Sequence, residues 1–312
     1  MSKVAFVFPG QGSQFVSMGR DLVAHFAEAK EVFDAADDAL GEKLSALCFE
    51  GPEEALKLTA NTQPAILAAS IAAQAVLSKR VSAPAFVAGH SLGEYSALVA
   101  SGAVSLPEAV RAVRVRGRLM QEVVPPGVGA MAAVIGLGAD AVKRVCADVA
   151  NGQVLEPANY NSPEQTVIAG HAAALERARS PLKDAGARRV LPLAVSAPFH
   201  CALMEPVKAP LRSVLATIAF RPPAFPVVTN VEAKPNSDPT RIAPLLIEQV
   251  SKPVRWVECV QEMCRNGVSR FVEVGPGKVL RGLIRQIAPQ AEVLNAEDSE
   301  SLKKVLAALE GQ

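Results

Sequence analysis

The chain has 312 residues, 50% of them hydrophobic, which is enough for one large domain, or a domain with an insertion, around a substantial core. Its 32 basic and 31 acidic residues leave a net charge of +1, so no overall field attracts nucleic acid or a membrane surface, and we expect neither as a partner. The five cysteines form no Cys-x-x-Cys pair and only four histidines are present, so we expect reduced thiols and no metal site.

The first predicted element is a short apolar strand over residues 4–8, followed by a loop over residues 9–14. Gly10 and Gly12 in this loop allow backbone N–H groups to face a ligand. The strand is too short to be the apolar region of a signal peptide, and no later stretch approaches the roughly 20 apolar residues that span a bilayer. We therefore expect a cytoplasmic protein.

A second strand is predicted over residues 86–88, and it runs into a Gly-x-Ser-x-Gly pattern, Gly89-His90-Ser91-Leu92-Gly93, that opens a helix over residues 92–100. The two glycines let the strand and the helix approach closely, so the serine at the turn presents its hydroxyl to solvent. The pattern therefore predicts a nucleophile elbow at Ser91. The N–H of Leu92 then lies at a helix N-terminus, where it stabilises a developing oxyanion.

The next helix is predicted over residues 106–122, where Ser105 and Glu108 have the spacing of a capping box. Apolar residues recur along one side of this helix, as expected for a buried stripe. Arg116 lies at the border of that stripe, where an unpaired guanidinium is costly to desolvate. We therefore expect an anionic group to contact Arg116.

The middle of the chain changes to short elements, which we assign to a small subdomain over residues 127–193. The predicted order is βαββαβ, the ferredoxin-like arrangement, with elements at 130–135, 140–149, 154–159, 165–169, 172–185 and 189–193. Residues 1–126 and 194–312 are expected to form one large subdomain, with further strands at 226–229 and 271–274. The predicted fold class is α/β, with a hydrolase-like, mainly parallel sheet and an inserted ferredoxin-like subdomain.

Several segments together resemble the malonyl-CoA:acyl carrier protein transacylase family. They occur in the expected order over nearly the whole chain and read FPGQGSQ, GHSLGEY, VRGRLMQ, NSPEQTVIAG, SAPFH and EVGPGKVL. The resemblance implies ping-pong transfer of malonyl from coenzyme A to a serine and then to the phosphopantetheine thiol of acyl carrier protein, for fatty acid synthesis. It implies no metal or redox cofactor, since the coenzyme A thioester is a substrate. We expect a monomer.

The resemblance assigns catalytic roles to residues that match its motifs. Ser91 resembles the nucleophile and His200 the base that a serine hydroxyl requires. The backbone N–H groups of Gln11 and Leu92 would form the oxyanion hole. A neutral backbone carbonyl near Gln249 would orient the imidazole in place of a carboxylate. The remaining histidines are interpreted as structural, namely His25, His90 and His171.

Substrate-binding roles follow from the same resemblance. Arg116 matches the residue that holds the malonyl carboxylate in a bidentate pair. Gln63 matches another pocket residue. Phe199 precedes the base and should narrow the acyl pocket, which favours malonyl over methylmalonyl. The segment before the base reads Ala197-Pro198 where relatives commonly have Gly-Ala, which leaves the shape of the side pocket open.

Three alternatives remain open. The elbow alone also fits a serine thioesterase or hydrolase, and the transacylase motifs fit a trans-acting acyltransferase of a polyketide pathway. A third alternative is a non-catalytic module that docks carrier protein. Acyl carrier proteins are acidic, so a basic rim is expected, and its candidates are Lys183, Arg188, Arg189, Lys278 and Arg281.

Overall fold

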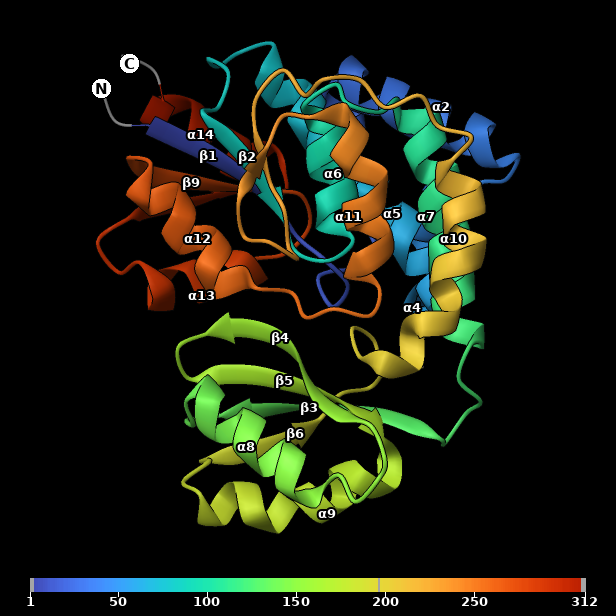
Figure 1. Cartoon of the computed structure of the whole chain (residues 1–312). Helices are drawn as coiled ribbons and strands as arrows, with labels where there is room; N and C mark the ends of the chain where they lie inside the picture. Colours follow the sequence, from blue (N-terminus) through green and yellow to red (C-terminus); the bar gives the residue numbers. More distant parts are fainter. Residues whose placement is uncertain (1–2, 196, 310–312) are drawn as a thin grey trace.

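The computed structural model describes residues 3–195 and 197–309, and it has two parts that are each built on their own sheet (Figure 1). Ser196, the first residue of the SAPFH segment, lies outside the described residues. The upper part in Figure 1 contains both ends of the chain, and the lower part is formed by the middle of the chain. This arrangement is the one expected when a small subdomain is inserted into a larger one.

The larger part contains a six-stranded sheet of order β10-β9-β1-β2-β7-β8. All neighbours pair in parallel except β7 and β8, which are antiparallel. The predicted α/β class with a mainly parallel sheet is therefore confirmed. The strands, in chain order, are β1 Lys3–Phe8, β2 Phe86–Gly89, β7 Val227–Val228, β8 Pro235–Asn236, β9 Val268–Val274 and β10 Glu292–Ala296.

Helices cover both faces of this sheet, and the alternation of side chains along β1 shows why. Phe6 and Phe8 point to one face and join a core with α5, α6, α7 and α14. Ala5 and Val7 point to the other face and pack with α12 and α13. These helices are α5 Thr59–Ser78, α6 Gly93–Ala100, α7 Leu106–Glu122, α12 Trp256–Arg265, α13 Val279–Ile287 and α14 Ser299–Leu309.

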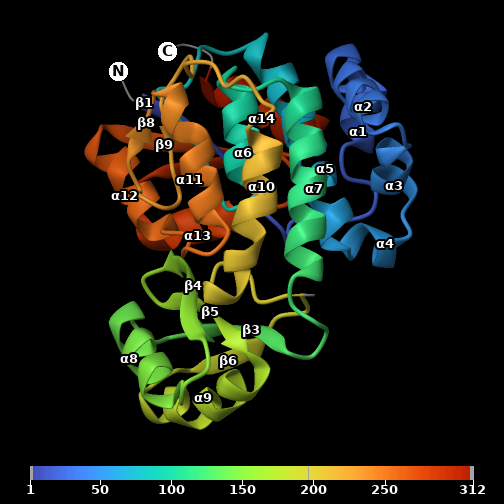
Figure 2. The ribbon, with the colours of Figure 1, turned by 45° about the vertical axis from the view of Figure 1, so that its right-hand side comes forward.

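The remaining helices lie around this core. Figure 2 shows α10 between α7 and α11, and α10 contacts each of these two helices. No helix in the described part of the chain is long and apolar enough to span a membrane. The remaining helices are α1 Arg20–His25, α2 Ala27–Leu40, α3 Leu44–Glu50, α4 Glu53–Lys57, η1 Ala202–Val207, α10 Lys208–Leu215, η2 Pro239–Arg241 and α11 Ile242–Gln249.

The smaller part contains an antiparallel sheet of order β4-β5-β3-β6, with α8 and α9 packed on one face (Figure 1). Its chain order βαββαβ matches the sequence prediction. The elements are β3 Gly129–Ile135, α8 Ala139–Val149, β4 Leu155–Ser162, β5 Gln165–His171, α9 Ala172–Asp184 and β6 Arg189–Pro192. The subdomain boundaries at residues 127 and 193 stay a prediction.

Helix α7 begins and ends at the predicted residues. Ser105 accepts a hydrogen bond from the backbone N–H of Glu108, and the Glu108 carboxylate accepts one from the backbone N–H of Ser105, which completes the predicted capping box. The helix packs along α5 and brings Arg116 toward the carboxyl ends of β1 and β2. In proteins with an open parallel sheet, ligands bind at the carboxyl ends of the strands.

Candidate active site

Ser91 lies at a sharp turn between β2 and α6, with the left-handed backbone angle φ = 52°. A side chain at Gly89 would place its Cβ 1.9 Å from the carbonyl carbon of Gly93, and one at Gly93 would lie 2.1 Å from the carbonyl oxygen of Phe8. Only glycine therefore fits on either side of the serine. The turn therefore has the strand-turn-helix geometry predicted from the Gly-x-Ser-x-Gly pattern, and the role of Ser91 as nucleophile stays a prediction.

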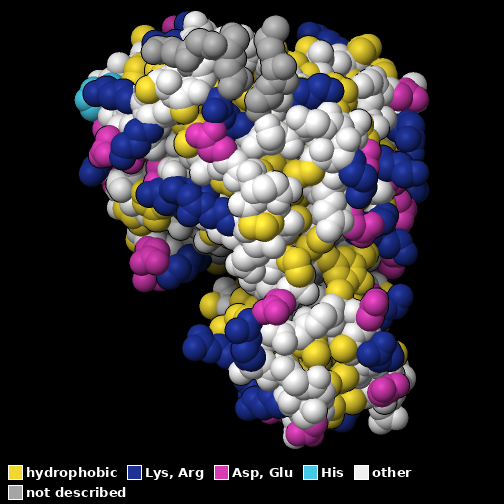
Figure 3. Space-filling view, turned by 90° about the vertical axis from the view of Figure 1, so that its left-hand side faces the viewer, with side chains coloured by type: hydrophobic (Ala, Val, Ile, Leu, Met, Phe, Trp, Pro, Cys, Tyr) yellow, Lys and Arg dark blue, Asp and Glu magenta, His cyan; other side chains and the backbone are white. Residues whose placement is uncertain are grey.

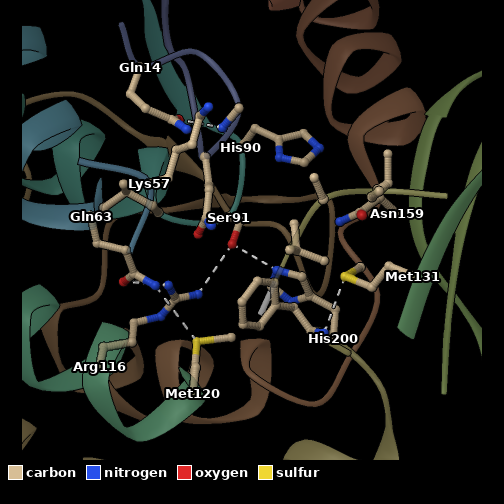
Figure 4. A pocket seen from close by; sticks show the side chains of 17 residues that line it. Gln14, Lys57, Gln63, His90, Ser91, Arg116, Met120, Met131, Asn159 and His200 are labelled. Carbon is tan, nitrogen blue, oxygen red and sulfur yellow. Dashed lines mark hydrogen bonds between the residues drawn. The ribbon is translucent and has the colours of Figure 1, made fainter. Parts of the chain in front are cut away.

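His200 faces Ser91 from the segment that precedes η1 (Figure 4). The Ser91 Oγ lies 2.7 Å from His200 Nε2, and His200 Nδ1 lies 2.8 Å from the backbone carbonyl oxygen of Gln249. A carbonyl only accepts, so Nδ1 carries the proton and Nε2 is free to accept the serine proton. The orienting group is thus the neutral carbonyl that the resemblance implied.

The imidazole of His200 is 4% exposed. Burial, together with the positive charge of Arg116, lowers the pKa of His200 to about 3. The ring is therefore neutral at ordinary pH, which is the protonation state that a general base requires.

Arg116 is 1% exposed and points from α7 toward the serine. Its guanidinium donates to the side-chain oxygens of Gln63 (2.8 Å) and Gln249 (2.9 Å), and to Ser91 Oγ (3.2 Å). Among the described residues its partners are amide and hydroxyl oxygens, and its Nε has none, so the expected anionic group is not a side chain of this part of the chain and stays a prediction. A buried cation with only neutral acceptors keeps an uncompensated charge, with which an anion from outside can pair.

The loop after β1 lies directly against the elbow. A Cβ at Gly10 would be 2.4 Å from the carbonyl oxygen of His90, so the two turns touch through backbone alone. Within residues 3–195 and 197–309, the backbone N–H groups of Gln11 and Leu92 have no hydrogen-bond partner. Two free N–H groups beside a nucleophile are what an oxyanion hole needs.

A cavity of about 360 Å³ opens at the serine (Figure 4). It is lined by polar groups, including Arg116 and Gln63, and by apolar side chains, including Met120 and Phe199. The smaller part contributes Met131 of β3 and Asn159 of β4, so the cavity lies where the two parts meet. Gln63 is 2% exposed, and the one described atom that its Nε2 contacts is the sulfur of Met120, at 4.0 Å.

The sequence prediction missed two buried residues, Asn230 and Glu94. Asn230 accepts the backbone N–H of Ser91 through its side-chain oxygen at 2.7 Å. Glu94, 3% exposed, accepts the backbone N–H of Asn230 at 2.9 Å and Nε2 of Gln249 at 2.8 Å. Asn230 follows β7, the strand beside β2, so its place at a parallel strand end was an available signal.

The other three histidines lie apart from the serine hydroxyl. His90 contacts the side-chain oxygen of Asn161 at 2.8 Å and lies edge-on to Trp256. His25 contacts a backbone carbonyl within α1, and His171 accepts the backbone N–H of Val154. No cluster of three or more His, Cys, Asp or Glu side chains that could hold a metal occurs in the residues described.

Comparisons with known proteins agree with this geometry. Residues 5–304 match the family described as acyl transferase domain. The chain is 48% identical to the malonyl CoA-acyl carrier protein transacylase of Escherichia coli (strain K12), over 99% of this chain and 100% of that protein.

Two solved structures are similar over almost their whole length. One is an acyl carrier protein S-malonyltransferase from Vibrio cholerae (TM-score 0.95, 49% identity, 97% of this chain and 100% of that one). The other is a malonyl-transacylase in complex with its type II PKS acyl-carrier protein (TM-score 0.96, 48% identity, 98% and 100%). The chain therefore belongs to the malonyl-CoA:acyl carrier protein transacylase family of acyl transferases.

Proposed function

We propose that this protein transfers the malonyl group of malonyl-CoA to the phosphopantetheine thiol of acyl carrier protein, through an ester on Ser91, and so supplies extender units for fatty acid synthesis. The observation that carries the proposal is the buried guanidinium of Arg116, which lies 3.2 Å from Ser91 Oγ with only neutral acceptors around it. A carboxylate on the acyl group would pair with this guanidinium, whereas an acetyl group would not.

In the first half-reaction, Ser91 Oγ attacks the thioester carbonyl while His200 Nε2 takes the hydroxyl proton. The N–H groups of Gln11 and Leu92 hold the oxyanion of the tetrahedral intermediate. The carbon–sulfur bond then breaks, and His200 returns the proton to the departing coenzyme A thiolate. The second half-reaction repeats these steps in reverse order, with the thiol of the carrier protein as nucleophile.

The orienting group argues for transfer and against the thioesterase alternative. His200 Nδ1 donates to the neutral carbonyl of Gln249, whereas serine hydrolases orient the imidazole with a carboxylate. A neutral partner stabilises imidazolium less than an anion does. A thiolate nucleophile therefore suits this site better than water, which needs stronger base assistance.

The proposal includes an acidic carrier protein as partner, bound by basic residues around the cavity mouth. Figure 3 shows lysine and arginine side chains on both sides of the indentation between the two parts. Among the candidates, Arg188 pairs with Glu164 and Lys278 with Glu297, so part of this charge is already compensated. The remaining candidates are Lys183, Arg189 and Arg281. We further propose a cytoplasmic monomer that needs no metal or redox cofactor.

Intact-mass measurement after mixing with malonyl-CoA or acetyl-CoA tests the proposal. The wild-type protein should acquire a malonyl adduct on Ser91 and little acetyl adduct. Arg116→Ala should lose malonyl adduct while keeping or gaining acetyl adduct, and the exposed Arg118→Ala on the same helix is the matched control. An unchanged malonyl-to-acetyl ratio in Arg116→Ala would refute the proposal.

A second assay compares carrier proteins, because one similar structure is a complex with a type II PKS acyl-carrier protein. We expect faster malonyl transfer to a fatty acid carrier than to a polyketide carrier. The reverse order would assign the enzyme to polyketide synthesis. The basic rim is tested in the same assay, since Lys183→Glu with Arg189→Glu should weaken transfer more at low salt than at high salt.

A further inference from the structure

Glu94 is a buried carboxylate that contacts no basic side chain in the described part of the chain. It is the second residue of α6 and is 3% exposed. Its Oε2 accepts two hydrogen bonds, from Nε2 of Gln249 at 2.8 Å and from the backbone N–H of Asn230 at 2.9 Å. A buried charge with only neutral donors is costly unless another charge nearby compensates it.

The compensating charge lies on the far side of Gln249. The Gln249 side-chain oxygen accepts from Arg116 Nη2 at 2.9 Å, while its Nε2 donates to Glu94 and to the backbone carbonyl oxygen of Ser91 (3.0 Å). A carboxylate only accepts and a guanidinium only donates, so this amide has one possible orientation. The negative end of its dipole faces the cation of Arg116 and the positive end faces the anion of Glu94, so the amide stabilises both charges.

We propose that Glu94 is a positioning residue that compensates the charge of Arg116 through the Gln249 amide, and thereby leaves the guanidinium free for the carboxylate of the acyl group. The inference rests on the malonyl-binding role proposed for Arg116. A carboxylate in direct contact with Arg116 would compete with the substrate for the same donors. With an amide between them, the protein can bury both charges and still offer the guanidinium to a ligand.

The same network reaches the base and the nucleophile. The backbone carbonyl of Gln249 orients His200, and the side chain of Asn230 holds the N–H of Ser91. Loss of the Glu94 charge should therefore change the electrostatic balance at His200, because Arg116 already lowers the pKa of that imidazole. Glu94 thus affects both substrate binding and proton transfer.

The pH dependence follows from the groups that face Glu94. These are Arg116 from α7, Tyr95 from α6 and Cys259 from α12. Burial raises the pKa of Tyr95 to about 12 and raises the pKa of Cys259 well above its usual value. Both side chains are therefore neutral. Burial raises the pKa of Glu94 itself to about 7, against its hydrogen bonds and Arg116. Below that pH the carboxyl gains a proton and the compensation is lost, so kcat should fall as pH decreases through about 7.

Glu94→Gln is the decisive variant, because both hydrogen bonds of Glu94 end on one oxygen and a glutamine carbonyl can retain them. The charge is lost, and an NH2 group takes the place of Oε1, which accepts no hydrogen bond from a described residue. We expect kcat to fall about tenfold, since the base loses a nearby anion, and KM for malonyl-CoA to fall about threefold, since Arg116 attracts the carboxylate more strongly. Acetyl-CoA should show the loss of kcat without the lower KM. The decrease of kcat below about pH 7 should disappear.

Glu273→Gln is the control for a buried carboxyl away from the cavity, because Glu273 is also fully buried and burial likewise raises its pKa to about 7. It accepts the backbone N–H of Leu280 on Oε1 and that of Arg281 on Oε2, so glutamine retains only one of these bonds, and it lies outside the cavity. This variant should keep the wild-type KM and the wild-type pH profile. The inference is overturned if Glu94→Gln raises KM for malonyl-CoA, or if its pH profile matches that of the wild type.

A double-mutant cycle covers the case in which Glu94→Gln folds poorly. Thermal unfolding is compared for Glu94→Gln, Arg116→Met and the double variant, which removes both charges. The double variant should melt higher than the sum of the single effects predicts, and additive effects would overturn the inference. A double variant that fails to fold would also count against it. Failure of the proposed function is a separate result, namely an unchanged malonyl-to-acetyl ratio in Arg116→Ala.

Discussion

The two parts of the molecule differ most in what they bury. Among the described residues, the larger part buries five aspartate, glutamate, arginine or histidine side chains, and these are Asp37, Glu94, Arg116, His200 and Glu273. In the smaller part, whose residues from β3 to β6 are all described, the buried polar side chains are the neutral Asn159, Asn161, Ser162 and Thr166. Charge is therefore buried in one part only.

This difference places the charged groups of the site in the larger part, while the smaller part contributes to the cavity wall. Three of the buried charged or titratable groups, Glu94, Arg116 and His200, belong to one hydrogen-bonded network around Ser91. The smaller part supplies Met131 and Asn159 to the cavity wall and has an apolar core of its own. Burying a charge is costly, and three of the five buried groups occur together beside Ser91, whereas the cavity wall only has to exclude water and fit the acyl group.

The largest effect is expected from His200→Ala, which removes the base from the charged network. Acylation of Ser91 should slow about 10³-fold, since no other described side chain accepts the serine proton. Rapid-quench mass spectrometry of the malonyl adduct measures the rate. His90→Ala is the control, because His90 neighbours Ser91 in sequence but contacts Asn161, and it should slow acylation far less. Equal losses in the two variants would contradict the assignment of the base.

Much of the fold could be predicted from the sequence, because local patterns determine it. The capping box and the apolar stripe gave the bounds of α7, and the six elements of the small subdomain appeared in the predicted order. The elbow at Ser91 follows from two glycines whose positions leave no room for a Cβ. The residues that form each of these patterns lie close together in the sequence.

The polar network could not be predicted in the same way. Glu94 and Gln249 are 155 positions apart, and Ser91 and Asn230 are 139 apart, so their hydrogen bonds depend on how strands and helices pack. The surroundings of Arg116 have the same origin. The sequence predicted that this guanidinium needs an anionic group, but it could not reveal that the amide of Gln249 lies between Arg116 and Glu94.

A large effect on stability alone is expected from Ile168→Ala in the smaller part. Ile168 of β5 is fully buried in the apolar core of that part, so its truncation should destabilise the fold by about 3 kcal/mol. Urea unfolding measures the loss, and the exposed Leu191→Ala is the control. The malonyl-to-acetyl ratio should not change. A changed ratio would mean that the smaller part also affects the selectivity between malonyl and acetyl groups.

A smaller effect is expected from Gly117→Ala, beside Arg116. A Cβ there would lie 2.6 Å from the backbone oxygen of Thr59, so α7 must move away from α5. The resulting strain should destabilise the protein by about 2 kcal/mol and raise KM for malonyl-CoA, because the guanidinium moves with its helix. Gly282→Ala in α13 is the matched control, since nothing lies within 4 Å of its Cβ and alanine should stabilise that helix slightly. An unchanged KM in Gly117→Ala would mean that the position of α7 does not limit binding.

The smallest effect is expected from Ser105→Ala, which removes the capping box at the start of α7. The N–H of Glu108 would lose its acceptor, at about 1 kcal/mol of unfolding free energy. Ser105→Thr retains a hydroxyl and should behave like the wild type in thermal unfolding. Arg116 lies about three turns further along the helix, and Gln63 and Gln249 hold it there, so KM for malonyl-CoA should be unchanged. If KM rises in Ser105→Ala but not in Ser105→Thr, the end of the helix controls the guanidinium, and the charged network is less independent of the surrounding fold than its contacts indicate.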